Sequence, residues 1–384
     1  MDEKRIHIVS FNVPYPANYG GVIDVFYKLK TLSENGVKVI LHAFEYGREP
    51  APELEKYCEK VYYYKRKTGI FSQLSGLPYI VCSRRNKELL ANLLKDNSPI
   101  LFEGLHCCYY LNHPLLKNRL KMVRAHNIES AYYRGLAENT TSPFLKPYFN
   151  WEAWKLKQFE PILSQANYIL TLSTVEKKYF ADKYGKDKTV YVPLFFQNQL
   201  ITSTVQTEMK PFVLYHGDLS TPENRKAAAF LIHSVASKDK NISWIFAGLN
   251  PQKDLLQLAE KYKNVTVLAN LSEEKMSQLI REASVHVLFT NQVSGVKVKL
   301  LHALDNGQHC LANKEMVEGS GLEKLCRIIS NQPDEILENI RECLRKPLSE
   351  TEIINRKATF HQLYDNTKNA LTVKELLTGN HFKP

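Results

Sequence analysis

The sequence has 384 residues, of which 44% are hydrophobic and 24% are charged. This composition excludes fibrous and disordered proteins, and the length predicts two domains. Lys and Arg number 51 against 40 Asp and Glu, and the net charge of +11 favours an anionic partner such as a nucleotide, a phospholipid surface or nucleic acid. Because lysines alternate with acidic residues and no basic block resembles a nucleic-acid-binding arm, we expect no nucleic acid partner. A solvated surface with excess charge explains the same balance.

The seven cysteines are spread along the chain without a C-x-x-C pair, so the sequence predicts neither a disulfide framework nor a zinc site. Reduced thiols are typical of the cytosol. The first apolar segment starts at Ile6 and leaves no room for a signal peptide, and no apolar run approaches the ~20 residues of a membrane-spanning helix. We therefore expect a cytoplasmic protein and leave open peripheral contact with the inner face of the membrane.

The sequence pattern of residues 1–195 predicts an α/β domain. The segment 6–11 is apolar and β-branched, a loop rich in proline and glycine follows, and apolar residues then recur at helical spacing over 22–32. The next strand, 37–42, completes a β-loop-α-β unit. This alternation predicts a parallel sheet covered by helices on both faces. The further strands that we predict in this domain are 60–64, 100–103, 121–124 and 168–173.

The alternating pattern lapses into polar residues between Pro193 and Pro211, which predicts a linker over 196–211. A second alternating series follows over 212–348, and two such doubly wound, Rossmann-like domains facing each other place a ligand cleft between their strand ends. The last stretch, 349–384, is predicted to be helical over 349–377, with enough length to run back to the first domain. The strands predicted in the second domain are 212–215, 243–247, 265–268, 285–289 and 308–312, and its helices are 227–237, 255–261, 273–282 and 298–304.

A glycine-containing loop follows the first predicted strand of each domain. Gly20 and Gly21 precede the first helix, where free N–H groups and close backbone approach suit an anion. The loop lacks the G-x-G-x-x-G spacing of dinucleotide-binding proteins, so an ordinary turn is the alternative interpretation. In the second domain Gly217 follows a strand, and Asn224 and Arg225 stand at the predicted helix start.

The segment 290–307 joins a strand to a helix through a polar loop that contains Gly295, Lys297 and Lys299. A helix N-terminus with two lysines is suited to hold a diphosphate. An ordinary solvent-facing helix start is the alternative.

Three segments together resemble glycosyltransferases of the GT-B fold, specifically a bacterial branch of retaining family 4. They are 14–36, the Arg-Ala-His-Asn-Ile-Glu run at 124–129 with the tyrosine pair 132–133, and 294–307. The resemblance extends over nearly the whole chain. It implies a hexosyltransferase that acts with retention on a nucleotide-diphosphate sugar and passes the hexose to a glycan or a lipid-linked acceptor during polysaccharide assembly.

The resemblance also implies roles for particular residues. Catalytic roles fall to His106, Arg225 and Lys299, and the acceptor side to Arg124, His126 and Glu129, although a salt bridge between Arg124 and Glu129 is an alternative. The residues implied in donor binding are Gly20, Gly21, Gly217, Asn224, Asn270, Leu271, Ser294, Gly295, Lys297 and His302.

The chain departs from this family at two positions. Ser294 and His302 stand where the E-x7-E element has its glutamates, and a neutral His is a weaker acceptor for ribose hydroxyls. A catalytically degraded binding subunit is therefore one alternative. A nucleotide-sugar epimerase of the same fold is another, but it needs a pair of acid-base carboxylates that the sequence does not reveal.

No D-x-D motif follows a predicted strand, so we expect no metal ion and no cofactor besides the sugar donor. Lys299 and Arg225 would neutralise the departing diphosphate instead.

The segment 143–155 combines aromatic and basic residues. On a helix, Leu156, Phe159 and Leu163 share one stripe, and Trp151 and Trp154 project away from it. Interfacial aromatic residues with lysines are typical of contact with an anionic membrane surface. Packing of the tryptophans inside the first domain is the alternative.

Overall fold

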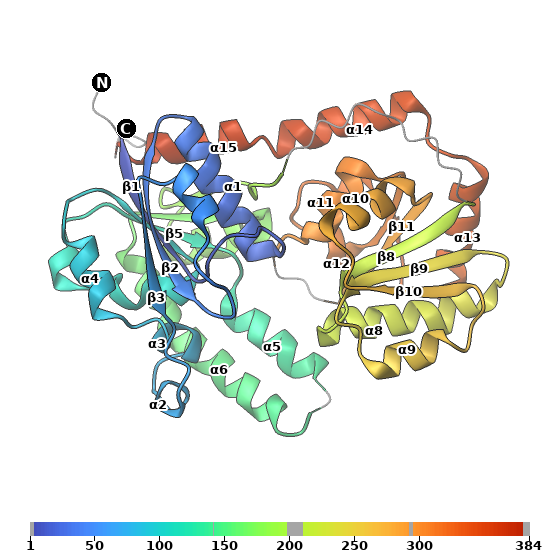
Figure 1. The fold of residues 1–384 in the computed structure, drawn as a ribbon, viewed down its shortest axis with the longest axis horizontal. Coiled ribbons are helices and arrows are strands. Elements are labelled where there is room, and N and C mark those ends of the chain that lie inside the picture. The colour runs from blue at the N-terminus through green and yellow to red at the C-terminus, as the bar shows by residue number, and fades with distance from the viewer. Residues whose placement is uncertain (1–3, 141, 198–209, 292–294, 379–384) are drawn as a thin grey trace. The chain divides into compact units, whose positions relative to one another are not determined.

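The computed structural model describes residues 4–140, 142–197, 210–291 and 295–378. The chain divides into two compact units, Met1–Gln197 with Tyr364–Pro384, and Asn198–Leu363. Each unit is an α/β domain built on a parallel sheet (Figure 1). The arrangement in which the two domains face each other across a ligand cleft stays a prediction.

The described strands of the first unit form a seven-stranded parallel sheet in the order β3-β2-β1-β4-β5-β6-β7. The chain moves outward from β1 to β3 and then returns to the other side of β1, so the order reverses between β1 and β4. Ile8 pairs with Leu41 on one side and with Leu101 on the other. The strands are β1 (Arg5–Ser10), β2 (Lys38–Glu45), β3 (Lys60–Lys65), β4 (Ile100–Glu103), β5 (Lys121–Ala125), β6 (Tyr168–Thr171) and β7 (Thr189–Tyr191).

Helices cover both faces of this sheet because side chains alternate along the buried strands. Ile8 packs into a core with residues of α1 and α15, whereas Val9 packs into a second core with residues of α3, α4, α6 and α7. The helix α15 lies against α1, and Lys374 donates a hydrogen bond of 2.7 Å to the carbonyl of Asn35 (Figure 1). The helices are α1 (Gly20–Glu34), α2 (Ile70–Gln73), α3 (Tyr79–Cys82), α4 (Lys87–Leu93), α5 (Glu129–Asn139), α6 (Leu145–Phe159), α7 (Thr174–Tyr184) and α15 (Asn366–Leu376).

The second unit repeats this plan with a six-stranded parallel sheet among its described residues, in the order β10-β9-β8-β11-β12-β13. Here the order reverses between β8 and β11. The strands are β8 (Phe212–Asp218), β9 (Ser243–Leu249), β10 (Val265–Ala269), β11 (Val285–Leu288), β12 (His309–Asn313) and β13 (Arg327–Ile329). The helices are α8 (Pro222–Phe230), α9 (Lys253–Ala259), α10 (Glu273–Glu282), α11 (Val298–Asn306), α12 (Lys314–Val317), α13 (Pro333–Arg345) and α14 (Glu350–Leu363).

Several predicted boundaries were wrong for local reasons. The helix predicted over 227–237 begins at Pro222, because the Thr221 side chain accepts the N–H of Asn224 and caps it. The helix predicted over 349–377 ends at Leu363, and the side chain of Asp365 caps a separate helix, α15. The structure therefore assigns α14 to the second unit and α15 to the first. The elements β7, β13 and α13 were not predicted.

Of the predicted linker, 198–209 lie outside the described residues. Phe196, at its predicted start, is buried in the first unit and donates its N–H to Asn366 at 3.0 Å. All seven cysteines are free thiols. None of the helices found in the described ranges is long and apolar enough to cross a membrane.

Candidate functional site

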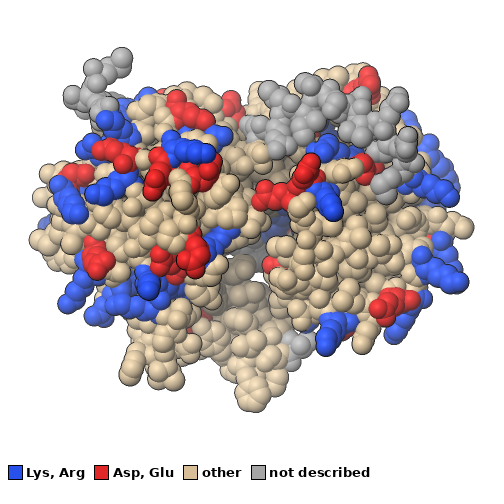
Figure 2. Space-filling model, in the orientation of Figure 1, with Lys and Arg blue, Asp and Glu red and all other residues tan. Residues whose placement is uncertain are grey.

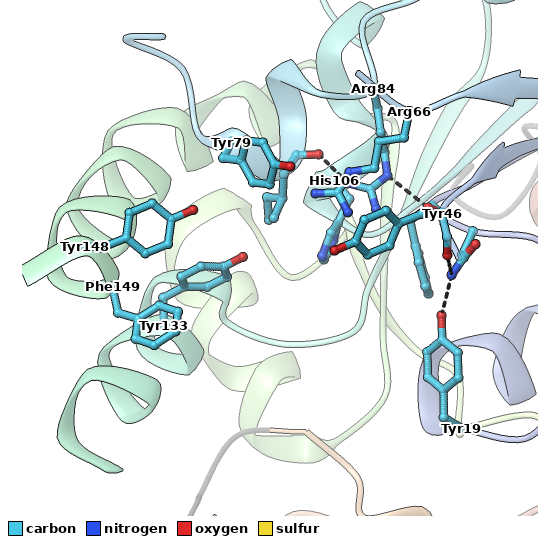
Figure 3. Close-up of a pocket in the computed structure, with 12 residues that line it drawn as sticks. Tyr19, Tyr46, Arg66, Tyr79, Arg84, His106, Tyr133, Tyr148 and Phe149 are labelled. Atoms are coloured by element: carbon cyan, nitrogen blue, oxygen red, sulfur yellow. Dashed lines mark hydrogen bonds between the residues drawn. The ribbon is translucent and has the colours of Figure 1, made fainter. Parts of the chain in front are cut away.

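A pocket of about 350 Å³ opens in the first unit at the carboxyl ends of β1 to β4 (Figure 3). Phe11 follows β1, Tyr46 follows β2, Arg66 follows β3, and His106 lies in the 3₁₀ helix Leu105–Tyr110 that follows β4. Tyr79, Tyr133, Tyr148 and Phe149 line it from α3, α5 and α6. Because the strand order reverses between β1 and β4, this is the position where open α/β sheets bind ligands.

The backbone after β4 is shaped to place His106 in this pocket. Gly104 has a φ of +70°, and a Cβ at this position would lie 2.7 Å from His106 Nδ1. A residue with a side chain would therefore be strained and would displace the imidazole. The ring of His106 also packs against Phe11, with 5.4 Å between their centroids.

Behind His106 lies Glu129, the first residue of α5, with 3.8 Å between His106 Nδ1 and Glu129 Oε1. Neither atom has a hydrogen-bond partner within the described part of the chain. Burial raises the pKa of Glu129 to about 8. Burial and the charge of Arg84 hold the pKa of His106 well below its ordinary value. At neutral pH the pair is a neutral imidazole beside a largely protonated carboxyl group.

Arg124, which we predicted on the acceptor side, belongs to a buried ion-pair network, and its role toward an acceptor stays a prediction. Its guanidinium donates to both carboxylate oxygens of Asp24 in α1, at 3.0 and 2.8 Å. The alternative of a salt bridge between Arg124 and Glu129 was therefore wrong. Asp24 lies 100 positions earlier in the chain and reaches Arg124 because α1 packs on the sheet that contains β5.

His126, also placed on the acceptor side, contacts the same network through Glu103 at 3.0 Å. Asp24, Glu103 and His126 are close enough together to hold a metal ion. However, Lys28 lies 2.8 Å from each of the two carboxylates and Arg124 pairs with Asp24, so two cations already balance two anions. A divalent ion would add uncompensated charge, and the cluster fits an ion-pair network better than a metal site.

The two glycines at the start of α1, Gly20 and Gly21, lie beside the pocket. The helix begins at Gly20, and a Cβ on Gly21 would lie 2.6 Å from Cζ of Phe11. Glycine is therefore needed for Phe11 to pack against the helix start. Tyr19, the residue before the helix, accepts a hydrogen bond of 3.0 Å from Asn12 and also lines the pocket.

In the second unit, three predicted site residues, Gly217, Asn224 and Lys299, come together where the strand order reverses between β8 and β11. Gly217, the last residue but one of β8, has a φ of +155°, and a Cβ there would lie 3.2 Å from the side-chain amide nitrogen of Asn224. A Cβ on Gly248 would lie 1.7 Å from the carbonyl oxygen of Gly217, so β9 passes close to this backbone. Lys299, in the first turn of α11, donates to Asn224 Oδ1 at 2.8 Å.

The ammonium of Lys299 is half-buried and lies 5.0 Å from the ring centroid of Tyr215. Burial lowers its pKa to about 8. Among the residues that the structure describes, none supplies a carboxylate within 4.0 Å of this ammonium. A cation held by neutral groups is suited to receive an anionic ligand.

The other predicted site residues of the second unit lie outside this group of three. Arg225 lies one residue beyond Asn224 with its Nε 3.8 Å from Asp254. Asn270 follows β10, two strands away from β8, and its side chain accepts the N–H of Asn250 at 2.8 Å. Leu271 packs against the apolar cluster around α10.

Around α11, Lys297 donates to the carbonyl of Gly295 at 2.8 Å. Burial lowers the pKa of His302 to about 4, so this imidazole is neutral at pH 7. Ser294 lies outside the described residues.

No known protein-family model matches the sequence. A relative, an uncharacterized 44.6 kDa protein in the cps region of Klebsiella pneumoniae, is 26% identical over 347 residues, covering 83% of this chain and 84% of the relative.

Solved structures match the chain along its length. Anabaena HepE in complex with UDP and glucose has a TM-score of 0.67 at 14% identity, covering 98% of this chain and 100% of HepE. A Rickettsia africae glycosyltransferase has a TM-score of 0.67 at 13% identity, covering 99% of each chain. The apo structure of OtsA has a TM-score of 0.65 at 13% identity, covering 99% of this chain and 100% of OtsA. The chain has the GT-B fold.

The predicted GT-B fold class is thus confirmed, whereas membership of retaining family 4 stays a prediction. Sequence reasoning missed Arg66 and Arg84 in the pocket of the first GT-B unit. Arg66 directly follows β3, and its position at a strand end was the one available signal. Arg84 follows the four-residue helix α3, and nothing local in the sequence indicates that it turns toward the pocket.

The tryptophans of α6 are exposed, as their position off the aliphatic stripe predicts. Trp151 is 42% and Trp154 is 58% exposed, whereas Leu156 and Leu163 are buried. The alternative of packing inside the domain was therefore wrong for Trp154. Trp151 contacts the neighbouring Lys155, whose ammonium lies 4.0 Å from its ring centroid.

Proposed function

We propose that the protein is a glycosyltransferase that moves a hexose from a nucleotide-diphosphate sugar to a glycan or a lipid-linked acceptor. The main support for this proposal is the position of the Lys299 ammonium. It donates a hydrogen bond to Asn224 where the strand order of the second sheet reverses, and no described residue supplies a carboxylate within 4.0 Å of it. The GT-B fold supports the assignment, because structures of HepE with this fold contain UDP and UDP-glucose.

On the donor side, the diphosphate gains negative charge as its bond to the sugar breaks. In this proposal Lys299 stabilises this charge, and the glycine at position 217 lets a phosphate approach the backbone closely. Arg225 is 30% exposed and only weakly paired with Asp254, so it can turn toward the same group. We propose that these cations replace a metal ion.

On the acceptor side, the pocket of the first unit receives the hydroxyl that attacks the sugar. The neutral imidazole of His106 offers a hydrogen bond to a sugar hydroxyl in this pocket. We propose retention at the anomeric carbon, with the leaving phosphate accepting the proton of the acceptor hydroxyl. Nuclear magnetic resonance of the product, which distinguishes its anomeric configuration from that of the donor, tests this part.

A binding subunit without turnover is the second candidate, and His302 in place of a glutamate favours it. An epimerase is less well supported. The carboxylates of Asp24 and Glu103 are neutralised by Lys28 and Arg124, so they do not form a free acid-base pair.

We further propose contact with an anionic membrane through α2 and α6. Phe71, Phe144 and Trp154 are exposed on these helices or next to them. Figure 2 shows little charge over the surface near α2 and the start of α6, whereas acidic and basic residues are intermixed elsewhere on the same unit. Exposed aromatic side chains of this kind insert at lipid headgroups.

Thermal unfolding with a panel of nucleotides and nucleotide sugars tests the donor assignment. A nucleotide at a hundred times its dissociation constant should stabilise the fold by about 2.7 kcal/mol. Lys299→Met should reduce this shift, and Lys240→Met, a change at an exposed lysine of the same unit, should preserve it. If the protein binds nucleotides but neither hydrolyses any sugar donor nor transfers its sugar, the alternative of a binding subunit without turnover is favoured.

A further inference from the structure

The pocket of the first unit contains two guanidinium groups that have no carboxylate partner among the described residues. Arg84 is only 4% exposed, and it donates to the carbonyls of Phe11 at 3.0 Å and Ile80 at 2.5 Å. Arg66 donates to Ser83 Oγ at 2.9 Å and stacks on Tyr46 and Tyr79, with 4.1 and 4.9 Å to the ring centroids. Figure 3 shows both guanidinium groups beside His106.

A buried cation without a counter-ion is costly. Carbonyl oxygens satisfy two of the donors of Arg84 but leave its charge uncompensated, and no described residue accepts a hydrogen bond from its Nη2. Burial, followed by the charge of Arg66, lowers the pKa of Arg84 to about 10. An anion that enters the pocket would remove this cost, and the guanidinium fork matches carboxylate and phosphate geometry.

The other titratable groups do not neutralise the two arginines. His106 is neutral because its pKa is lowered, and Glu129 is largely protonated at neutral pH because burial raises its pKa to about 8. Tyr133 and Tyr148 have raised pKa values and stay uncharged. The pocket therefore carries a net positive charge from Arg66 and Arg84.

The rest of the lining suits a sugar ring. Tyrosines present flat apolar faces together with hydroxyl groups, which match the C–H faces and the hydroxyls of a pyranose. The volume of about 350 Å³ lies at the small end of the range for small-molecule sites.

We propose that this pocket binds a sugar that carries an anionic group, a carboxylate or a phosphate, with Arg84 and Arg66 holding the anion. Identifying that sugar as the acceptor rests on the proposed function, whereas the binding itself does not.

Calorimetry with three probes, glucose, glucuronate and glucose 6-phosphate, tests the inference. At least one of the two anionic probes should bind about tenfold or more tightly than glucose, and the preference between them identifies the anion. Added salt should weaken the binding of that probe.

Arg66→Met should lower the affinity of that probe to the level of glucose. Arg84→Met should do the same. The Arg84 side chain also donates hydrogen bonds to two backbone carbonyls, which contribute to folding. Arg84→Lys is therefore the comparison variant, because it keeps the positive charge but loses the paired N–H donors of the guanidinium. Arg85→Met is the matched control, since Arg85 is the exposed neighbour of Arg84 and does not line the pocket.

The inference is overturned if all three probes bind equally, if none binds, or if both Arg→Met variants keep the preference for the anion. It is also overturned if UDP alone displaces the anionic sugar, because the arginines would then serve the donor. In each case intact hydrolysis of nucleotide sugars would leave the proposed function standing with a different acceptor. If the anionic sugar binds but no nucleotide sugar binds, the proposed function is refuted and the proposed anionic-sugar site stands.

Discussion

Lys299 and Asn224 are joined by a hydrogen bond of 2.8 Å between Nζ and Oδ1. The lysine belongs to α11, which follows β11, and the asparagine belongs to α8, which follows β8. These are the two strands between which the order of the second sheet reverses. The contact therefore places a cation at the strand ends where α/β sheets bind nucleotides.

Lys299→Met should lower turnover more than it weakens donor binding. The ammonium would face a diphosphate whose negative charge grows in the transition state, and loss of one such donor costs about 10²–10³ in turnover. Steady-state kinetics with the cognate donor measures both parameters. Lys240→Met serves as the control, and equal losses in the two variants would rule out a specific role for Lys299.

His302 lies three residues after Lys299 and should contact the ribose, which does not change during the reaction. His302→Ala should raise the donor's KM about fivefold, since a neutral hydrogen bond contributes about 1 kcal/mol, and should nearly preserve kcat. His302→Glu should keep or improve donor affinity. If calorimetry shows that His302→Ala leaves nucleotide binding unchanged, this face of α11 does not contact the donor.

Glu129 should make the stability of the folded protein depend on pH. Its pKa is raised from 4.5 to about 8, so the folded state binds a proton that the unfolded state has lost between these values. Stability should therefore fall as the pH rises through this window, by at most about 1.4 kcal/mol per unit from this group.

Glu129→Gln, which mimics the protonated form, isolates this contribution from those of the neighbouring His106, Arg84 and Tyr133. In chemical denaturation between pH 5 and 8, its stability should decline less steeply than that of the unmodified protein. Parallel profiles for the two proteins would mean that Glu129 is ionised in the folded state.

Activity should persist in excess EDTA, because we propose that Lys299 and Arg225 neutralise the diphosphate and because the Asp24 cluster is already balanced by Lys28 and Arg124. Transfer is measured before and after dialysis against the chelator. Complete loss that magnesium or manganese restores would contradict the proposal.

Changing both Trp151 and Trp154 to Ala should weaken binding to anionic liposomes about tenfold or more, since burial of one large apolar side chain contributes about 1.5–3 kcal/mol. The thermal unfolding temperature should stay nearly unchanged because Trp154 is exposed. Leu371→Ala, at an exposed residue of α15, is the control in vesicle co-sedimentation. Unaltered liposome binding by the folded double variant would exclude α6 as the contact.

The residues of most strands and of helices such as α10 could be predicted from the sequence, because these depend on local patterns. The predicted strand 100–103 and the predicted helix 273–282 match β4 and α10 residue for residue. Gly217, Asn224 and Lys299 could also be singled out, since each stands where a strand ends or a helix begins. Short elements with little apolar alternation, such as β13, could not be found in this way.

Contacts between distant residues were decided by the tertiary structure. The sequence places Arg124 and Glu129 five positions apart, yet Arg124 pairs with Asp24 across the packing of α1 on the sheet. Arg66 and Arg84 likewise share a pocket with His106 because β3 and β4 lie on opposite sides of β1 with their carboxyl ends together. Strand order depends on long-range packing, which hydrophobic periodicity does not reveal. The periodicity indicates only which residues of each element face the core.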